Sequence, residues 1–179
     1  MRSRRGAAVL VDRDGVVNVR RPDHVRSWAE FEFLPGSLEA MRRLRRAGRR
    51  VLVLTNQAVV GRGQMSAGEL DEIHDRMRAA VAAAGGGIEG VLACVHRPED
   101  GCRCRKPAPG LFHRAADEMR VDLGRSVMIG DAWSDVQAAH AAGCRAVWVG
   151  PDAAAREAEA GPVPIARDLL DAVTRLGEC

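Results

Sequence analysis

Five short apolar runs recur along the chain, and a helical pattern separates most of them from the next. Short runs of aliphatic and β-branched residues are typical of buried strands, whereas apolar residues three and four apart predict amphipathic helices. Strands that alternate with helices form parallel sheets, because each connection crosses the sheet through a helix. We therefore predict an α/β fold with a mainly parallel sheet. The predicted strands are 7–12, 51–55, 88–95, 127–131 and 146–149, and the predicted helices begin at Pro35, Ser66, Pro109, Trp133 and Ile165.

The length and composition predict one globular domain over residues 1–179. The chain is 46% hydrophobic and 28% charged, and it lacks an apolar run of the ~18 residues that a membrane-spanning helix needs. Its basic start is followed by an apolar stretch too short for a signal peptide, so a cytoplasmic location is expected. The net charge of +3 does not indicate nucleic-acid binding. Segment 41–50 contains six arginines but also an apolar stripe at helical spacing, which indicates an amphipathic helix with a charged, solvent-exposed face.

Two carboxylates, Asp12 and Asp14, directly follow the first apolar run. Residues two apart in an extended chain point the same way, so both side chains can converge at the carboxyl edge of the sheet. Carboxylates that close repel each other unless a cation lies between them, and oxygen ligands suit Mg²⁺. For this pair alone, an acidic turn at a strand end remains the simpler alternative.

Three further strand ends carry polar groups that suit phosphate chemistry. Thr55 offers a hydroxyl and the backbone N–H groups after it, which can bind a phosphate. Lys106 can neutralise both a phosphate and the carboxylates around it. Asp131 supplies a third carboxylate for Mg²⁺, and Asp135 lies behind it.

A set of three cysteines and one histidine lies within eleven residues, as Cys94, His96, Cys102 and Cys104. Thiolates and imidazole are the ligands that Zn²⁺ prefers, and four protein ligands complete a structural site. Reduced thiols or a disulfide are the alternatives. A zinc ion here would stiffen a polar loop at about 94–107 and position Arg105 and Lys106.

In this order, Asp12-x-Asp14, Thr55, Lys106 and Gly130-Asp131 with Asp135 resemble the four motifs of the haloacid dehalogenase (HAD) superfamily of phosphohydrolases. The resemblance covers roughly residues 7–150 and implies a three-layer Rossmann-like fold. It implies that Asp12 is a nucleophile that forms an aspartyl-phosphate, and that Asp14 is the general acid and base. By the same resemblance, Mg²⁺ is held by the side chains of Asp12 and Asp131 and the carbonyl of Asp14, while Thr55 and Lys106 bind the transferring phosphoryl oxygens.

The spacing between these motifs leaves no room for a cap domain. Only 40 residues separate Asp14 from Thr55, and 50 separate Thr55 from Lys106. The predicted helices, strand and loops account for both stretches. We therefore expect loops to shape the site, above all the zinc-bearing loop.

Within the superfamily, Asp-Arg-Asp-Gly-Val-Val-Asn, Thr-Asn-Gln, the Cys/His set and Cys-Arg-Lys-Pro together resemble the D-glycero-D-manno-heptose 1,7-bisphosphate 7-phosphatases. Histidinol-phosphate phosphatase domains share most of these features. The heptose resemblance implies a small phosphorylated sugar as substrate, with Arg105 at its second phosphate or sugar. The implied substrate contacts are Arg13, Arg20, Asp23, His24, Asn56, Gln57, Ala58 and Arg105. The chain departs from the family at Ala58-Val59, which replaces Ser-Gly, and at Ala132, which replaces Lys.

Other functions fit parts of the same pattern: a histidinol-phosphate phosphatase, another small-sugar phosphatase, a nucleic-acid 3′-phosphatase, or a catalytically silent zinc- or RNA-binding protein. Histidinol phosphate carries one phosphate and a cationic amine, so its pocket needs an acidic residue rather than a second cationic one. We expect a monomer without a nucleic-acid or membrane partner. Cys144 is interpreted as a core thiol, Cys179 as a tail residue, His74 as structural or surface, and segment 151–164 as loosely held.

Overall fold

The computed structural model describes residues 5–150 and 163–177. Of the segment expected to be loosely held, only Val163 and Pro164 belong to the described residues, and Cys179 lies outside them.

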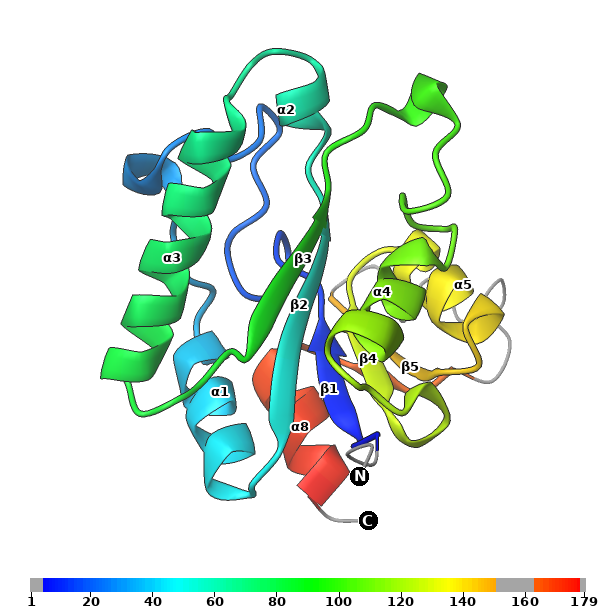
Figure 1. Ribbon diagram of the computed structural model, residues 1–179. Coiled ribbons are helices and arrows are strands. Elements are labelled where there is room, and N and C mark those ends of the chain that lie inside the picture. Colours follow the sequence, from blue (N-terminus) through cyan, green and yellow to red (C-terminus); the bar gives the residue numbers. More distant parts are fainter. Residues whose placement is uncertain (1–4, 151–162, 178–179) are drawn as a thin grey trace.

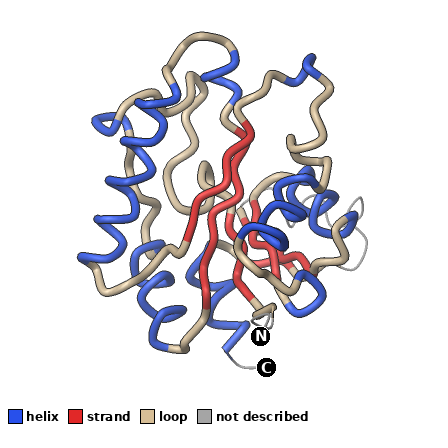
Figure 2. The backbone as a smooth tube through the Cα atoms, viewed as in Figure 1, coloured by secondary structure: helices blue, strands red, loops and turns tan. Residues whose placement is uncertain are grey.

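A six-stranded parallel sheet forms the centre of the molecule (Figure 1), in the order β3-β2-β1-β4-β5-β6. β1 therefore lies between β2 and β4, which places the ends of all three strands side by side. The tube view (Figure 2) shows the strands running together between the helices. The strands are β1 (Ala8–Val11), β2 (Arg50–Asn56), β3 (Gly90–Cys94), β4 (Val127–Gly130), β5 (Arg145–Val149) and β6 (Ile165–Ala166).

Helices cover both faces of the sheet and complete the predicted three layers (Figure 1). On one face lie α1 (Ser37–Arg46), α3 (Ala67–Ala83) and α8 (Leu169–Gly177), and on the other lie α4 (Gly110–Glu118) and α5 (Trp133–Ala141). Shorter elements are η1 (Trp28–Glu30), α2 (Ala58–Gly61), η2 (Pro98–Asp100) and η3 (Leu123–Arg125). α3 begins with the expected capping box between Ser66 and Glu69.

Alternating strand residues build a separate core on each face, as the period of two requires. In β1, Val9 and Val11 pack under α1, α3 and α8, whereas Ala8 and Leu10 pack under α4 and α5. The same alternation runs through β2, β4 and β5. Because both faces are covered, the central residues of these strands are apolar on both faces, and the polar site residues gather at or beyond their carboxyl ends.

The structure corrects the prediction for the last segment. Ile165 and Ala166 form the edge strand β6 beside β5, and the helix begins only at Leu169. The short helix α2 was not predicted, since four residues do not establish a helical period. Between residues 5 and 150, the connections after β1 and β2 contain no additional domain over the strand ends, as expected. Among the described residues, no helix is both long enough and apolar enough to cross a membrane.

Candidate active site

Asp12 is the first residue after β1, and its position is fixed by the neighbouring strand. Its backbone N–H donates to the Ile129 carbonyl of β4 at 2.9 Å, and its side chain is buried. Thr55 is the second-last residue of β2 on one side, and Asp131 follows β4 on the other. The parallel strand order therefore brings together three of the predicted site residues.

Lys106 comes from the loop before α4 and lies under Asp12. Its Nζ donates to Asp12 Oδ1 at 2.9 Å and to the Leu54 carbonyl at 2.6 Å, and it forms an ion pair with Asp135 Oδ1 at 2.6 Å. Lys106 as a whole is 3% exposed. Burial alone lowers the pKa of Lys106, but the two carboxylates outweigh it and raise the pKa, so the side chain stays charged.

The carboxylates of Asp12, Asp131 and Asp135 form a cluster in which one oxygen of each lies within 4.8 Å of the others. Burial raises the pKa of Asp12 to about 7, although Lys106 acts in the opposite direction. Burial also raises the pKa of Asp131 to about 6, against the effect of Arg20. Crowded, buried carboxylates of this kind fit a divalent cation with oxygen ligands, so the donor set suits Mg²⁺.

Gly15 allows Asp131 to approach this cluster. It has a φ of +90°, and a Cβ atom at this position would lie 1.9 Å from Asp131 Oδ2. Both the backbone conformation and the close contact therefore require glycine.

Arg20 contacts two of the groups predicted to hold Mg²⁺. Its Nη2 lies 2.7 Å from Asp131 Oδ1 and 3.5 Å from the Asp14 carbonyl. The guanidinium thus supplies a positive charge at the predicted metal position, and its side chain remains half-exposed at the edge of the cavity.

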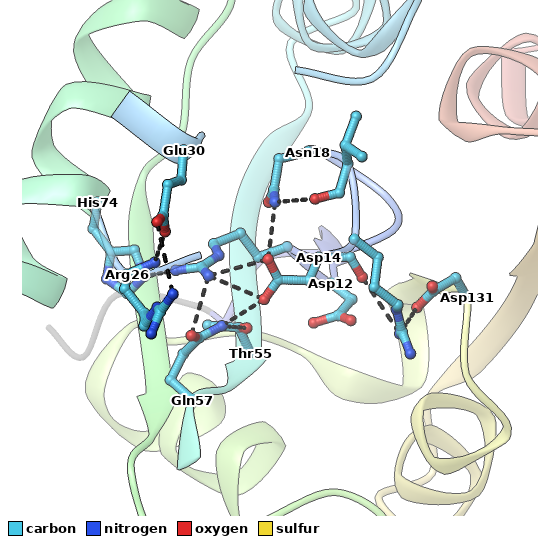
Figure 3. A network of polar contacts seen from close by, with 12 residues as sticks. Asp12, Asp14, Asn18, Arg26, Glu30, Thr55, Gln57, His74 and Asp131 are labelled. Atoms are coloured by element: carbon cyan, nitrogen blue, oxygen red, sulfur yellow. Dashed lines mark hydrogen bonds and ion pairs between the residues drawn. The ribbon is translucent and has the colours of Figure 1, made fainter. Parts of the chain in front are cut away.

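Asp14 is held by three side chains (Figure 3). Asn18 Nδ2 donates to its Oδ1 at 2.8 Å, Gln57 Nε2 donates to its Oδ2 at 2.7 Å, and Arg13 Nη2 lies 3.0–3.1 Å from both oxygens. Burial raises the pKa of Asp14, but the charge of Arg13 and the hydrogen bonds from Asn18 and Gln57 overcome this effect and lower it. The carboxylate orientation is therefore determined by its neighbours.

A cavity of about 460 Å³ opens above these groups. Its lining residues are Asp12, Asp14, Arg20, Arg21, Pro22, His24, Thr55, Asn56, Arg105, Lys106, Ala132, Ser134 and Asp135. All three lining carboxylates have a cationic partner, namely Lys106 for Asp12 and Asp135 and Arg13 for Asp14. A larger cavity of about 570 Å³ lies at the amino ends of β1 and β4 and contains none of the predicted site residues.

The Cys/His set forms a compact cluster beside this cavity, at the end of β3. Its sulfur atoms lie 3.2–3.6 Å apart, and His96 Nδ1 lies 3.2 Å from Cys104 and 3.7 Å from Cys94. Bonds of about 2.0–2.3 Å to a tetrahedral Zn²⁺ require ligand separations of about 3.3–3.8 Å. The cysteines are not disulfide-bonded. Burial raises the pKa of Cys94 to about 12, so this thiol needs a neighbouring cation to ionise at neutral pH. The donor set and its spacing thus fit structural zinc.

Comparison with known proteins places this geometry in a family. A HAD-hydrolase-like family model matches residues 103–172. The chain is 43% identical over 141 residues to the D-glycero-β-D-manno-heptose-1,7-bisphosphate 7-phosphatase of Bordetella bronchiseptica, covering 79% of this chain and 78% of the relative. It is 39% identical to the enzyme of the same name from Pseudomonas aeruginosa, covering 79% of each chain. The chain belongs to the heptose-1,7-bisphosphate 7-phosphatase family.

A third relative is similar in sequence, but its name specifies the α anomer of the sugar instead of the β anomer. The D-glycero-α-D-manno-heptose-1,7-bisphosphate 7-phosphatase of Mycobacterium bovis is 38% identical over 152 residues, covering 79% of this chain and 78% of the relative. Among solved structures, the D,D-heptose 1,7-bisphosphate phosphatase of B. bronchiseptica, complexed with magnesium and phosphate, superimposes with a TM-score of 0.89 at 36% identity. That match covers 97% of this chain and 99% of the other. Heptose-1,7-bisphosphate 7-phosphatases are HAD-type phosphatases, so the predicted family and fold are confirmed.

Four residues predicted as substrate contacts line the cavity of this family member, and four do not. Arg20, His24, Asn56 and Arg105 belong to the lining. Arg13 is buried beneath Asp14, Gln57 bonds to Asp14 and Thr55, Ala58 is buried at the start of α2, and Asp23 pairs with Arg21 and Arg26. The backbone N–H of Gln57 donates to the Cys94 carbonyl, so it is already engaged.

Three residues of the heptose-1,7-bisphosphate 7-phosphatase site escaped the sequence reasoning. Ser134 lines the cavity, Asn18 holds Asp14, and His74 contacts Arg13 from α3. The first two had a usable signal, because Ser134 lies between Asp131 and Asp135 and Asn18 lies four residues after Asp14. His74 had none, since its contact depends on how α3 packs on the sheet.

Proposed function

We propose that this chain removes the 7-phosphate of D-glycero-D-manno-heptose 1,7-bisphosphate and leaves the 1-phosphate in place. Arg105 supports this substrate most directly. It lines the cavity next to Lys106, and its buried Nη1 has no hydrogen-bond partner among the described residues. A buried guanidinium nitrogen without an acceptor is costly, and a second phosphate can accept its hydrogen bonds.

The charges of the cavity also discriminate between the substrates considered. Its lining carries Arg20, Arg21 and Arg105 in addition to Lys106. Since each lining carboxylate is already paired with a cation, the described residues offer no spare acidic group for the amine of histidinol phosphate. A bisphosphate complements this cavity better than an amino phosphate does.

In this proposal Asp12 attacks phosphorus and the sugar oxygen leaves. The neighbours of Asp14 lower its pKa, so its protonated form is the minor one; that form gives its proton to the leaving oxygen, and the resulting carboxylate then removes a proton from the water that hydrolyses the aspartyl-phosphate. Lys106 and the Thr55 hydroxyl bind the phosphoryl oxygens as negative charge spreads over them.

Mg²⁺ would be held by the side chains of Asp12 and Asp131 and by the Asp14 carbonyl, with Asp135 behind them. When bound, it offsets the charge of the carboxylates and the phosphate. Zn²⁺ would be held by Cys94, His96, Cys102 and Cys104, and its role is structural because all four ligands come from the protein.

We also propose that residues 1–179 form a single phosphatase domain that works as a monomer in the cytoplasm, without nucleic-acid or membrane partners. The net charge of +3 supports a small-molecule rather than a nucleic-acid substrate. Light scattering of the purified protein tests the monomer, and a dimer mass would refute it.

The deciding experiment compares phosphate release from heptose 1,7-bisphosphate and from histidinol phosphate in Mg²⁺, with Asp12→Asn as the blank. We expect a much higher kcat/KM for the bisphosphate, and ³¹P NMR should show that the 1-phosphate is retained. A higher kcat/KM for histidinol phosphate would refute the heptose bisphosphate as the substrate and favour histidinol phosphate instead. Running both anomers determines which one this chain prefers.

A further inference from the structure

The side chain of Arg13 lies beneath the carboxylate pair rather than in the cavity. Arg13 lies in the bend that follows β1, where its carbonyl accepts from the backbone N–H groups of Val17 and Asn18. Its side chain is 0% exposed. A buried guanidinium remains charged and is costly unless its partners are well placed, so these partners determine where it lies.

One of these partners is His74, a buried residue of α3. Arg13 Nη1 lies 3.2 Å from His74 Nε2. Because every guanidinium nitrogen is a donor, Nε2 must be the acceptor, and the ring proton is then on Nδ1. Burial and the charge of Arg13 lower the pKa of His74 to about 4, which keeps the ring neutral and able to accept.

The other end of the same guanidinium reaches Asp14. Arg13 Nη2 contacts both Asp14 oxygens and lies 3.1 Å from Gln57 Oε1. A guanidinium is planar and rigid, so an acceptor at Nη1 also fixes the position of Nη2. The guanidinium that contacts His74 of α3 thus also contacts the Asp14 carboxylate at the sheet edge.

We infer that His74 is a positioning residue for the reaction: by holding Arg13, it directs the Asp14 carboxyl at the oxygen of the leaving sugar. The inference rests on the proposed function, in which Asp14 is the general acid. Without an acceptor at position 74, the Arg13 Nη1 protons are buried without a partner, and the guanidinium must turn toward another acceptor. Asp14 then loses one of the three side-chain contacts that orient it.

This role has a kinetic signature that a purely structural role lacks. A sugar oxygen is a poor leaving group and needs the proton from Asp14, whereas 4-nitrophenolate leaves without one. For the aryl ester, kcat/KM reports the steps up to phosphorylation of Asp12, so it does not include the later action of Asp14 on water. A displaced Asp14 therefore lowers kcat/KM for the sugar phosphate far more than for 4-nitrophenyl phosphate.

The test compares His74→Leu with His74→Gln in the full chain with Mg²⁺, using both esters. Leu fills the space without an acceptor, whereas the Gln carbonyl can accept from Arg13. His74→Met replaces Leu if that variant does not fold, because Met is also apolar and is a good helix former. Met77→Ala is the matched control, since it weakens the same buried face of α3 at a residue other than the acceptor of Arg13.

We expect His74→Leu to lower kcat/KM about tenfold or more for the sugar phosphate and less than about threefold for the aryl ester, mainly through kcat. His74→Gln should restore most of the loss, and Met77→Ala should lower Tm without changing the ratio between esters. Equal losses on both esters, or a Gln variant as poor as Leu, would overturn the inference. If wild type does not cleave the heptose bisphosphate but cleaves another alkyl phosphate, the proposed substrate fails and the same comparison is made on that ester.

Discussion

Asn56 binds both backbone groups of Lys106: its Oδ1 accepts from the Lys106 N–H, and its Nδ2 donates to the Lys106 carbonyl, each at 3.1 Å. Asn56 ends β2, so this pair of hydrogen bonds attaches the loop that carries Lys106 to the rigid centre of the sheet. The ammonium group can then reach Asp12 from a segment 94 residues further along the chain.

Asn56→Ala should therefore reduce activity through Lys106. We expect kcat to fall about tenfold or more, because small displacements of a catalytic group are costly, and we expect KM to rise less. Asn56→Asp retains an acceptor for the Lys106 N–H but loses the donor, so its loss should be intermediate. Steady-state kinetics on the bisphosphate measure kcat and KM for both variants. An unchanged kcat in Asn56→Ala would contradict the idea that the two hydrogen bonds with Asn56 position Lys106.

Gly15→Ala should weaken Mg²⁺ binding, because the new methyl group occupies the space of the Asp131 carboxylate. Gly63→Ala is the matched control: Gly63 also has a positive φ, but a Cβ there meets nothing within 4 Å. Both changes should cost about 1 kcal/mol of stability through backbone strain, but only Gly15→Ala should lower Mg²⁺ affinity in isothermal titration calorimetry. Equal affinity in the two variants would show that Asp131 does not need this space.

Arg105→Gln should raise KM for the bisphosphate and leave the hydrolysis of a monophosphate ester nearly unchanged. Removing one charged hydrogen-bonding partner of a phosphate costs about 1.5–3 kcal/mol, or roughly 10- to 150-fold in kcat/KM. Arg103→Gln is the control, since Arg103 is exposed in the same loop and outside the cavity lining. Equal losses of kcat/KM on the bisphosphate and the monophosphate would show that Arg105 does not recognise a second phosphate.

Cys104→Ser should weaken zinc binding, and the loop at about 94–107 should become less ordered as a result. We expect elemental analysis to find one zinc per wild-type chain and less in the variant, together with a lower Tm and lower kcat, because Arg105 and Lys106 follow directly in sequence. Cys144→Ala provides the comparison: this buried cysteine lies in the core under α5, so its loss should lower Tm but not zinc content. If elemental analysis finds no zinc in the wild-type protein, the zinc hypothesis is wrong and the cluster consists of reduced thiols.

The pH dependence of stability should carry a contribution from His74. Its pKa is about 4 in the folded protein, below the ordinary value of 6.5, because burial and Arg13 disfavour the charged ring. Below pH 6.5 the unfolded chain therefore binds a proton that the folded chain does not, and stability falls as the pH decreases toward 4.

Between pH 7 and pH 5 this contribution amounts to about 2 kcal/mol. The acidic site residues also titrate in this range, so the quantity to measure is the difference between wild type and His74→Gln in urea unfolding. That difference should shift against wild type as the pH falls, and a constant difference would contradict the low pKa of His74.

Much of the fold was predictable because its signals are local. The five predicted strands are present, since each is a short apolar run flanked by helical patterns. β6 was missed because its two residues are too few to show a strand period, and their pairing with β5 depends on the tertiary structure. The convergence of Asp12, Thr55 and Asp131 followed from the parallel strand order alone.

The parts of the site that escaped prediction depend on side-chain directions across the sheet. Arg13 sits between two predicted catalytic carboxylates in sequence, yet its guanidinium is buried against α3. Asp23 lies in the segment that lines the cavity, yet it pairs with Arg21 and Arg26 at the surface. Sequence spacing places a residue near a site, but packing decides which way it faces. The catalytic roles themselves remain predictions.

The residues anchored to the sheet and the residues of segment 21–24 have different roles at the cavity of this enzyme. Arg21, Pro22 and His24 line the cavity from that segment, whereas Asp12, Thr55 and Lys106 are anchored to the sheet. Substitutions within residues 21–24 can therefore change which sugar is accepted without moving Asp12, Thr55 and Lys106. A scaffold arranged in this way can diversify its substrates by point mutation while retaining its chemistry.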